Sequence, residues 1–242
     1  MSKAVTDALT RKLSATTNLD SEDIAAIEAL PIDVRSLPAR QLIVRDGESP
    51  NACCLLIEGF AFRSKMTIAG KRQILSIHVP GDIPDLQSLY LGKMDHDFST
   101  LNEATVGFIG HVPLRQLIRR RIRIAEALWR ETLIDAAIFR EWIVNVGQRP
   151  GRVRLAHLLL EMKQRLAVVG GLNGNALELP MNQQELADAL GITAVHVSRI
   201  MKELRERGLV EFQRHLVIIR DEKRLRDFGE FDPIYLHEDS GT

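Results

Sequence analysis

Residues 181–210, MNQQELADALGITAVHVSRIMKELRERGLV, constrain the fold more than any other part of the chain. The pattern predicts two short helices joined by a tight turn at Gly191, because glycine adopts left-handed backbone angles without strain. Asn182 can cap the first helix, and Glu185 is placed to reach back and complete a capping box. Thr193 can cap the second helix. The segment therefore predicts a helix-turn-helix.

The second predicted helix, 193–207, has one apolar and one basic face. Its inward side chains recur at helical spacing and are Val197, Ile200, Met201 and Leu204. Its outward side chains are Val195, His196, Ser198, Arg199, Lys202 and Arg205. Such a helix can pack its apolar side on a small core and place its basic side in the major groove of DNA.

Two cations on this face suit different kinds of DNA contact. The Arg199 guanidinium can bond O6 and N7 of one guanine, whereas Lys202, further along the helix, suits a phosphate. Two short β-prone runs follow between Leu209 and Arg220 and predict a wing. The alternative is a helical hairpin with a solvated charged face. The combination of caps, turn, apolar stripe, outward arginine and wing favours DNA binding.

Residues 34–112 have a different sequence pattern, in which glycines separate short runs of β-prone residues. The runs are Gln41–Val44, Ala52–Ile57, Phe60–Thr67, Gln73–His78 and Thr105–Gly110. Strands at this spacing predict an antiparallel barrel or jelly roll. A short helix is predicted before them, over 18–30, with Asn18 or Asp20 as its cap.

A long helical pattern follows the β-prone runs and spans 114–147. Apolar or small residues recur in two series seven residues apart, and the predicted dimerisation residues from them are Ile122, Ala125, Trp129, Thr132, Ala136, Phe139 and Ile143. Such a seam over more than three heptads is typical of a coiled coil, here between two copies of the chain. The alternative is a helix packed on its own β domain.

Pro150 and Gly151 end that helix and mark a predicted hinge. The sequence thus predicts an α+β chain in three parts. Residues 1–113 form a β-roll sensor domain (a double-stranded β-helix, or jelly roll), 114–147 a dimerisation helix, and 148–242 a winged helix-turn-helix DNA-binding domain.

Composition excludes several classes of protein. Lysine plus arginine equal aspartate plus glutamate at 32 each, which argues against a purely electrostatic DNA binder. No apolar run is long enough to span a membrane, and the N-terminal residues lack the apolar core of a signal peptide, so we expect a cytoplasmic protein. Cys53 and Cys54 are adjacent, so in a strand they point to opposite faces and cannot share a metal ion. We predict no metal site.

The segment ELADALGITAVHVSRIMKELRERGLV closely resembles the Crp/Fnr superfamily of bacterial transcription regulators. Weaker similarity to the FixK- and Fnr-like branch extends through LPARQLIVRDGE, CLLIEGFAFRSKMTIAGKRQILSIHVPGD and FGEFDPIYLH. The resemblance implies a β-roll like that of cyclic-nucleotide-binding proteins, a long dimerisation helix and a C-terminal winged helix-turn-helix. It also implies a homodimer that binds a palindromic operator in double-stranded DNA and contacts RNA polymerase.

The family's base-reading positions fall on Ala194, Val195, Ser198 and Arg199. Ser198 and Arg199 match Fnr-like members, but Val195 replaces the usual glutamate and can contact only a thymine methyl group. His196, where the family usually has threonine, and Gln183 match phosphate-contacting positions. Together with the helix cap Thr193 and the outward Lys202, these residues make up the predicted DNA-binding set.

The predicted sensor lacks the residues that known effectors of the superfamily need. In the family a glutamate binds the ribose and an arginine binds the cyclic phosphate. Asp85 could replace the glutamate, but no arginine lies between Arg72 and Arg115, and His96 lies between two aspartates that repel a phosphate. The sequence therefore argues against a cyclic nucleotide.

Iron–sulfur clusters and haem are also disfavoured. The chain has two cysteines, whereas a cluster of the Fnr type needs four thiolates. His78, His96 and either cysteine could ligate haem, but a single histidine in a β domain is more often an ordinary polar residue. We predict no cofactor and assign no effector.

The favoured function is a homodimeric, sequence-specific transcription regulator whose helix 193–207 reads a palindromic operator. The alternative is a ligand-binding β-roll module that acts through protein interactions without specific DNA binding. An enzyme built on the β-roll would need clustered histidines and a carboxylate around a metal ion. His78, His96 and His111 are widely separated, so we predict that the protein is not an enzyme.

Overall fold

The computed structural model describes residues 2–172 and 174–237. Its contacts divide the chain into two compact units: the first holds the chain up to Lys65 together with Ser76–Ala136, and the second holds Met66–Leu75 and Ala137–His237. This boundary lies inside the long helix, away from the predicted limits at 113 and 147. The ends of the predicted outer domains, residue 1 and residues 238–242, lie outside the described residues.

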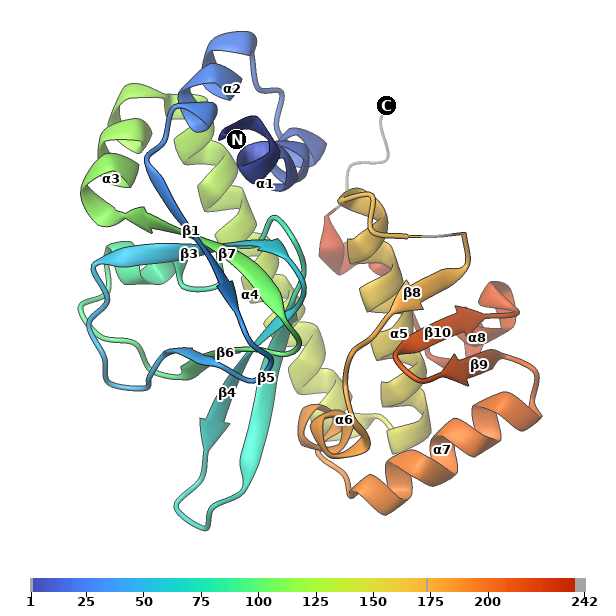
Figure 1. Cartoon of the computed structure of the whole chain (residues 1–242). Coiled ribbons are helices and arrows are strands. Elements are labelled where there is room, and N and C mark those ends of the chain that lie inside the picture. The colour runs from blue at the N-terminus through green and yellow to red at the C-terminus, as the bar shows by residue number, and fades with distance from the viewer. Residues whose placement is uncertain (1, 173, 238–242) are drawn as a thin grey trace. The chain divides into compact units, whose positions relative to one another are not determined.

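Two antiparallel sheets form the β-rich part of the chain (Figure 1). The three-stranded sheet has the order β1 (Ile32–Leu37), β7 (Ala104–Gly110), β3 (Ala52–Glu58). The four-stranded sheet has the order β2 (Leu42–Val44), β6 (Asp97–Thr100), β4 (Ala61–Met66), β5 (Arg72–His78). Leu56 and Val106 of the first sheet share a buried cluster with Ala61 and Phe98 of the second. Two packed sheets confirm the predicted β fold.

Two strands, β1 and β6, were absent from the sequence prediction. The four central residues of β1, Asp33–Ser36, are exposed, so its sequence lacks the apolar alternation of a half-buried strand. Strand β6 has only four residues. Both are held by pairing with strands distant in the sequence, β1 with β7 and β6 with β2 and β4.

Two helices precede the sheets. Helix α1 (Ser2–Thr16) was not predicted, and it buries Leu9 and Leu13 in the core of the first unit. Helix α2 (Ser21–Glu28) confirms the predicted short helix, and Asp20 rather than Asn18 caps it. A short 3₁₀ helix, η1 (Leu86–Leu89), follows β5.

The predicted long helix is present, but it is not continuous over 114–147, because the structure has two helices there. Helix α3 (His111–Arg120) ends at Arg121, whose backbone is extended, and α4 (Ile122–Gln148) begins directly afterwards. An ion pair joins Arg121, between the two helices, to α2: Arg121 Nη1 lies 2.8 Å from Glu22 Oε2. The break lets α3 and α4 each turn apolar side chains, such as Leu114 and Ile124, into one core.

The second unit contains the remaining helices and a small sheet. Its elements after α4 are α5 (Gly151–Val168), β8 (Ala176–Glu178), α6 (Gln183–Leu190), α7 (Ala194–Glu206), β9 (Val210–Gln213), β10 (Leu216–Ile219), α8 (Glu222–Phe228) and the 3₁₀ helix η2 (Pro233–Leu236). The sheet has the order β8-β10-β9, and α7 packs against α5, α6 and β9 (Figure 1). This arrangement confirms the predicted winged helix-turn-helix. No helix within residues 2–172 and 174–237 is long and apolar enough to cross a membrane.

Candidate nucleic-acid interface

A capping box fixes the start of α6. The Asn182 side chain accepts a hydrogen bond from the Glu185 amide at 2.9 Å, and the Glu185 carboxylate accepts one from the Asn182 amide at 2.8 Å. Both bonds satisfy amides that the first turn of a helix leaves without partners. The box predicted from the sequence is confirmed, and it sets where Gln183, the exposed first residue of α6, is presented.

The turn between α6 and α7 has the predicted geometry. Gly191 has φ +64° and ψ 36°, the left-handed region that favours glycine, and its amide donates to the Ala187 carbonyl. The Thr193 hydroxyl accepts from the His196 amide at 3.2 Å and caps α7. The angle between the two helices is therefore set by local backbone geometry.

Helix α7 buries the face that its sequence predicts. Val197, Ile200 and Leu204 are buried, whereas Met201, predicted to face inward with them, is only half-buried. Met201 lies at the edge of the apolar stripe, where the helix turns towards solvent. The buried stripe leaves the rest of α7 exposed.

The predicted DNA-contacting residues of α7 lie on its solvent side. Thr193, Val195, His196, Ser198, Arg199 and Lys202 are exposed, and Ala194 is half-buried. Lys202 lies 3.7 Å from Glu206, an exposed pair of little energetic consequence. Arg199 has no carboxylate partner among the residues that the structure describes. Its guanidinium is therefore available to an anionic or hydrogen-bonding partner.

The β9–β10 hairpin forms the predicted wing. Gln213 pairs with Leu216 at its end, and the turn residues Arg214 and His215 are exposed. Arg214 has φ +53°, an unusual value for a residue with a side chain. The hairpin adds two exposed basic side chains that the sequence analysis did not include among the binding residues.

Helix α4 leaves an apolar face uncovered. Ile122, Trp129 and Ile143 of the predicted seam are largely exposed, as is Thr132, whereas Ala125, Ala136 and Phe139 are half-buried. The opposite face packs inside the chain through residues such as Ala127 and Trp142. Beside the exposed face lies a groove of about 480 Å³, lined by Leu86, Gln87, Leu89, Tyr90, Leu91, Ile118, Ala125, Leu128, Trp129 and Thr132. Contiguous exposed apolar surface of this kind is typical of an interaction site.

A buried arginine that the sequence analysis missed lies inside the first unit. Arg63 of β4 donates to the Pro84 carbonyl at 2.8 Å and to Asp135 of α4 at 2.6 Å. Arg63 lies before the segment 73–114, which lacks arginine, and only the fold brings β4 to the loop before η1. The signal in the sequence is a charged residue directly after the apolar residues Phe60–Phe62.

Comparison with known proteins identifies both parts of the chain. Residues 153–228 match the Crp-like helix-turn-helix domain, and residues 34–121 match the cyclic nucleotide-binding domain. The transcriptional activator protein FnrL of Cereibacter sphaeroides is 24% identical over 219 residues, which cover 87% of this chain and 86% of FnrL. The chain belongs to the Crp/Fnr family of transcription regulators.

Other Crp/Fnr proteins support the same placement. The nitrogen fixation regulation protein FixK of Rhizobium meliloti is 26% identical over 175 residues, covering 72% of this chain and 75% of FixK. The structure of FixK2 from Bradyrhizobium japonicum has a TM-score of 0.75 at 23% identity, and the match covers 82% of this chain and 98% of FixK2. These relatives place the chain in the FixK/Fnr branch of the family, and it is a DNA-binding transcription regulator.

Within this Crp/Fnr chain, Asp85, which the sequence suggested as a ribose ligand, is fully buried. Its Oδ1 accepts from the Cys54 amide at 2.7 Å, and burial raises the pKa of its carboxyl to about 7. His96 is also buried and bonds Asp95 at 2.7 Å. Burial, and then the nearby charge of Arg63, lower the pKa of His96 and disfavour its cationic form. Asp85 Oδ1 and His96 Nδ1 are thus engaged within the chain, whereas Asp85 Oδ2 and His96 Nε2 are buried without a hydrogen-bond partner among the described residues.

Other candidate ligands are also engaged. His78 is buried, with Nδ1 3.0 Å from Asp82 and Nε2 2.8 Å from the Ser76 hydroxyl, so both ring nitrogens have partners. Cys53 and Cys54 are fully buried and lie in different core clusters, which confirms that they point to opposite faces of β3. Burial raises the pKa of Cys53 to about 12 and that of Cys54 well above its usual value, so both remain neutral thiols.

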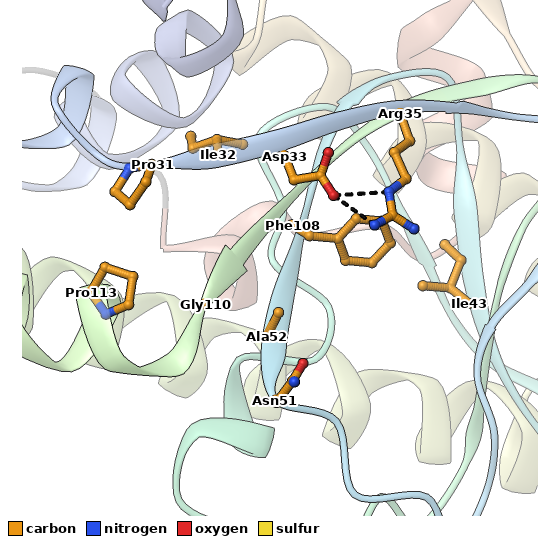
Figure 2. Close-up of a pocket in the computed structure, with 10 residues that line it drawn as sticks. All are labelled: Pro31, Ile32, Asp33, Arg35, Ile43, Asn51, Ala52, Phe108, Gly110 and Pro113. Atoms are coloured by element: carbon orange, nitrogen blue, oxygen red, sulfur yellow. Dashed lines mark hydrogen bonds and ion pairs between the residues drawn. The ribbon is translucent and has the colours of Figure 1, made fainter.

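An open groove of about 830 Å³ lies over the three-stranded sheet, where the sequence analysis had placed no site. Figure 2 shows Asp33 and Arg35 of β1 pointing towards each other beside the Phe108 ring. Arg35 donates through Nε at 3.0 Å and Nη2 at 2.6 Å to one Asp33 oxygen, and its guanidinium lies 5.0 Å from the centre of the Phe108 ring. The charge of Arg35 is thus balanced within the strand itself.

Proposed function

We propose that this Crp/Fnr regulator binds a palindromic operator as a homodimer and inserts α7 into the major groove. The observation that carries the proposal is the exposed face of α7, where Arg199 has no acidic partner within the described chain. The arginine can bond O6 and N7 of a guanine, the commonest specific contact between proteins and DNA. Ser198 can bond a neighbouring base, and the exposed Val195 and half-buried Ala194 offer apolar contacts to a thymine methyl group.

The remaining predicted residues are proposed to contact phosphates. Gln183 lies at the start of α6, and His196 lies in the first turn of α7 beside the start of α5, where a Cβ placed on Gly151 would lie 3.1 Å from its Nε2. Thr193 caps α7 through its hydroxyl, so we assign it the positioning of the helix start. Lys202 lies two turns into the helix, where phosphate contact is favoured.

The dimer is proposed to form through the exposed face of α4. Ile122, Trp129 and Ile143 are exposed at intervals of seven or fourteen residues, as a coiled-coil seam requires. Ala125, Thr132, Ala136 and Phe139 complete the seam that we propose. A two-fold dimer would present its two recognition helices about 34 Å apart on one side of the duplex.

The three predicted parts can be assigned roles on this basis. We propose that 1–113 forms the sensor, 114–147 the dimerisation segment and 148–242 the DNA-binding domain. The partner of such a dimer is chromosomal DNA. We therefore propose that the dimer works in the cytoplasm and contacts RNA polymerase. Regulation, rather than catalysis, is the activity of its family.

We propose that the β-roll takes no cyclic nucleotide, haem or iron–sulfur cluster. Arg63 is committed to Asp135 and the Pro84 carbonyl, Asp85 receives an internal amide, and His78 has both nitrogens bonded. Arg63 and His78 would each have to break a buried hydrogen bond to receive a ligand, at a cost of about 1–3 kcal/mol. Asp85 keeps one oxygen, Oδ2, without a partner among the described residues, but its carboxyl is buried away from solvent. We expect no saturable binding of cyclic AMP in calorimetry and no Soret band in the purified protein; either signal would contradict the proposal.

Paired substitutions test the DNA-binding role of α7. Arg199→Ala should weaken specific operator binding by about 1–3 kcal/mol, or roughly 5- to 150-fold, and relax one base position. Lys202→Ala should weaken operator and random DNA alike and reduce the salt dependence of binding by about one unit of slope. Both side chains are exposed, so neither change should alter folding. Equal losses on operator and random DNA for Arg199→Ala, measured by footprinting and titration, would rule out its base-reading role.

A further inference from the structure

The junction between α4 and α5, predicted from Pro150 and Gly151 to be a hinge, is held by several hydrogen bonds. Arg149 donates to Glu141 and, at 2.9 Å, to Asn145, so it is bound to the last turns of α4. The Arg149 carbonyl accepts from Arg154 of α5 at 2.7 Å. A break in the helix that is bridged on both sides cannot move freely.

The same junction is connected to the helix-turn-helix. Besides the Arg149 carbonyl, Arg154 bonds the Leu190 carbonyl at 2.6 Å, at the end of α6 and next to the Gly191 turn. Arg154 therefore joins the α4–α5 junction to the turn that presents α7. These elements all belong to the second unit.

A buried carboxylate lies at the centre of this unit. Glu161 of α5 accepts from the Trp142 indole of α4 at 3.0 and 3.1 Å and from the Tyr235 hydroxyl of η2 at 2.9 Å. Arg165 lies 3.5 Å from it. A buried carboxylate without such partners would be costly, so the three donors are held together around it. Through Glu161, the C-terminal tail and α4 are fixed to the same point of α5.

The tail itself packs tightly on α5. The Tyr235 hydroxyl also lies 3.1 Å from His157 Nε2, and His157 Nδ1 lies 3.2 Å from the Gly229 carbonyl. A Cβ on Gly229 would lie 3.0 Å from the His157 amide nitrogen, so the tail backbone touches the backbone of α5. Glu230 extends the contact to the junction, because it accepts from Arg149 at 3.3 Å.

We propose that the C-terminal tail, residues 229–236, is a clamp that locks the α4–α5 junction and so fixes the recognition helix relative to α4. Tyr235, Glu161 and Trp142 are its positioning residues, acting on DNA binding through the orientation of α7. The tail lies beyond residues 153–228, which match the helix-turn-helix domain. The inference rests on the proposed dimer through α4, because only in a dimer does this orientation set the spacing between two half-sites.

The test is selectivity for half-site spacing. A palindromic duplex is selected from a random library with the unaltered protein, and derivatives carry one or two additional base pairs between the half-sites. Each added base pair rotates one half-site by about 34° relative to the other. A locked junction should reject these derivatives, whereas a loosened one should tolerate them.

Tyr235→Phe removes one hydroxyl and keeps the ring. We expect the preference for the selected spacing to fall at least about three- to tenfold, the effect of losing one hydrogen bond, because the hydroxyl bonds both Glu161 and His157. Trp142→Phe, which removes the indole donor to Glu161, should act in the same direction. Ile234→Ala is the matched control, since Ile234 belongs to the same tail but its side chain is largely exposed.

A second readout needs no DNA. Amide hydrogen exchange of residues 141–148 and 151–156 should be faster in Tyr235→Phe and Trp142→Phe than in Ile234→Ala. Unchanged spacing preference and exchange in both variants would overturn the clamp, as would equal weakening on every spacing, which marks a general loss of stability. If the unaltered protein selects no palindrome at all, it is the proposed dimeric operator binding that fails.

Discussion

Truncation of Trp129 to alanine should convert the protein to a monomer. Trp129 is 66% exposed in the single chain, so this substitution leaves the packing within the chain largely intact. A buried tryptophan removes about 150–250 Å² from water, and two-thirds of that area at about 25 cal/mol per Å² corresponds to about 2.5–4 kcal/mol per protomer. In a two-fold dimer both copies lose this area, a total of about 5–8 kcal/mol when the side chain is fully covered.

Sedimentation equilibrium measures the effect directly. A loss of about 5 kcal/mol raises the dimer dissociation constant by more than three orders of magnitude, so the variant should sediment as a monomer at micromolar concentration. Val112→Ala is the control, because Val112 is also 66% exposed but lies at the start of α3, outside the seam. Far-ultraviolet circular dichroism should show both variants folded. A Trp129→Ala protein with the dissociation constant of the unaltered chain would place the interface elsewhere and refute the reading of α4.

Three further predictions concern the interior of the chain. Burial, and behind it the charge of a neighbouring arginine, lower the pKa of His157 to about 4, below its unfolded value of 6.5. As the pH falls, the unfolded chain therefore binds the proton before the folded chain does. The free energy of unfolding should fall by about 2–3 kcal/mol as the pH drops from about 6.5 towards 4. Urea titrations of His157→Gln should show a free energy of unfolding that depends less on pH, and an unchanged dependence would assign the effect to other groups. Cys53 and Cys54 should react with iodoacetamide only on unfolding, so mass spectrometry that finds either thiol modified in the native protein would contradict their burial. Gly59→Ala should lower the melting temperature far more than Gly191→Ala, which should cost about 1–2 kcal/mol. A Cβ at Gly59 would lie 2.6 Å from a backbone carbonyl oxygen, whereas the atom nearest to a Cβ at Gly191 would be 3.5 Å away. Similar melting temperatures for the two variants would show that the backbone around Gly59 can move aside.

The recognition element could be predicted in detail because its geometry is local. The Asn182–Glu185 box and the Thr193 cap each join residues three positions apart, and the Gly191 turn depends on one pair of backbone angles. The buried face of α7 follows from helical periodicity alone. Met201 is the exception, since its degree of burial depends on which neighbours extend to the edge of the stripe.

The errors in predicting the first unit have a different origin. Strand β1 has four exposed central residues and exists because it pairs with β7, about 70 residues later in the chain. The continuous helix predicted over 114–147 followed its heptad pattern, which does not reveal the break at Arg121. That break lets α3 and α4 pack on one core and is bound through ion pairs to α2. Pairing and docking of distant elements overrode the local pattern at both places.

The sequence by itself determined the two helices of the helix-turn-helix, their caps and turn, the outward position of Arg199, and the opposite directions of the Cys53 and Cys54 side chains. Each depends on backbone geometry within a few residues. Only the tertiary structure decided that Arg63 lies inside the first unit against Asp135, 72 positions away, and that Tyr235 reaches Glu161 across 74. A hydrogen bond over such a distance is fixed by how the chain closes on itself, and no spacing or periodicity along the sequence records it.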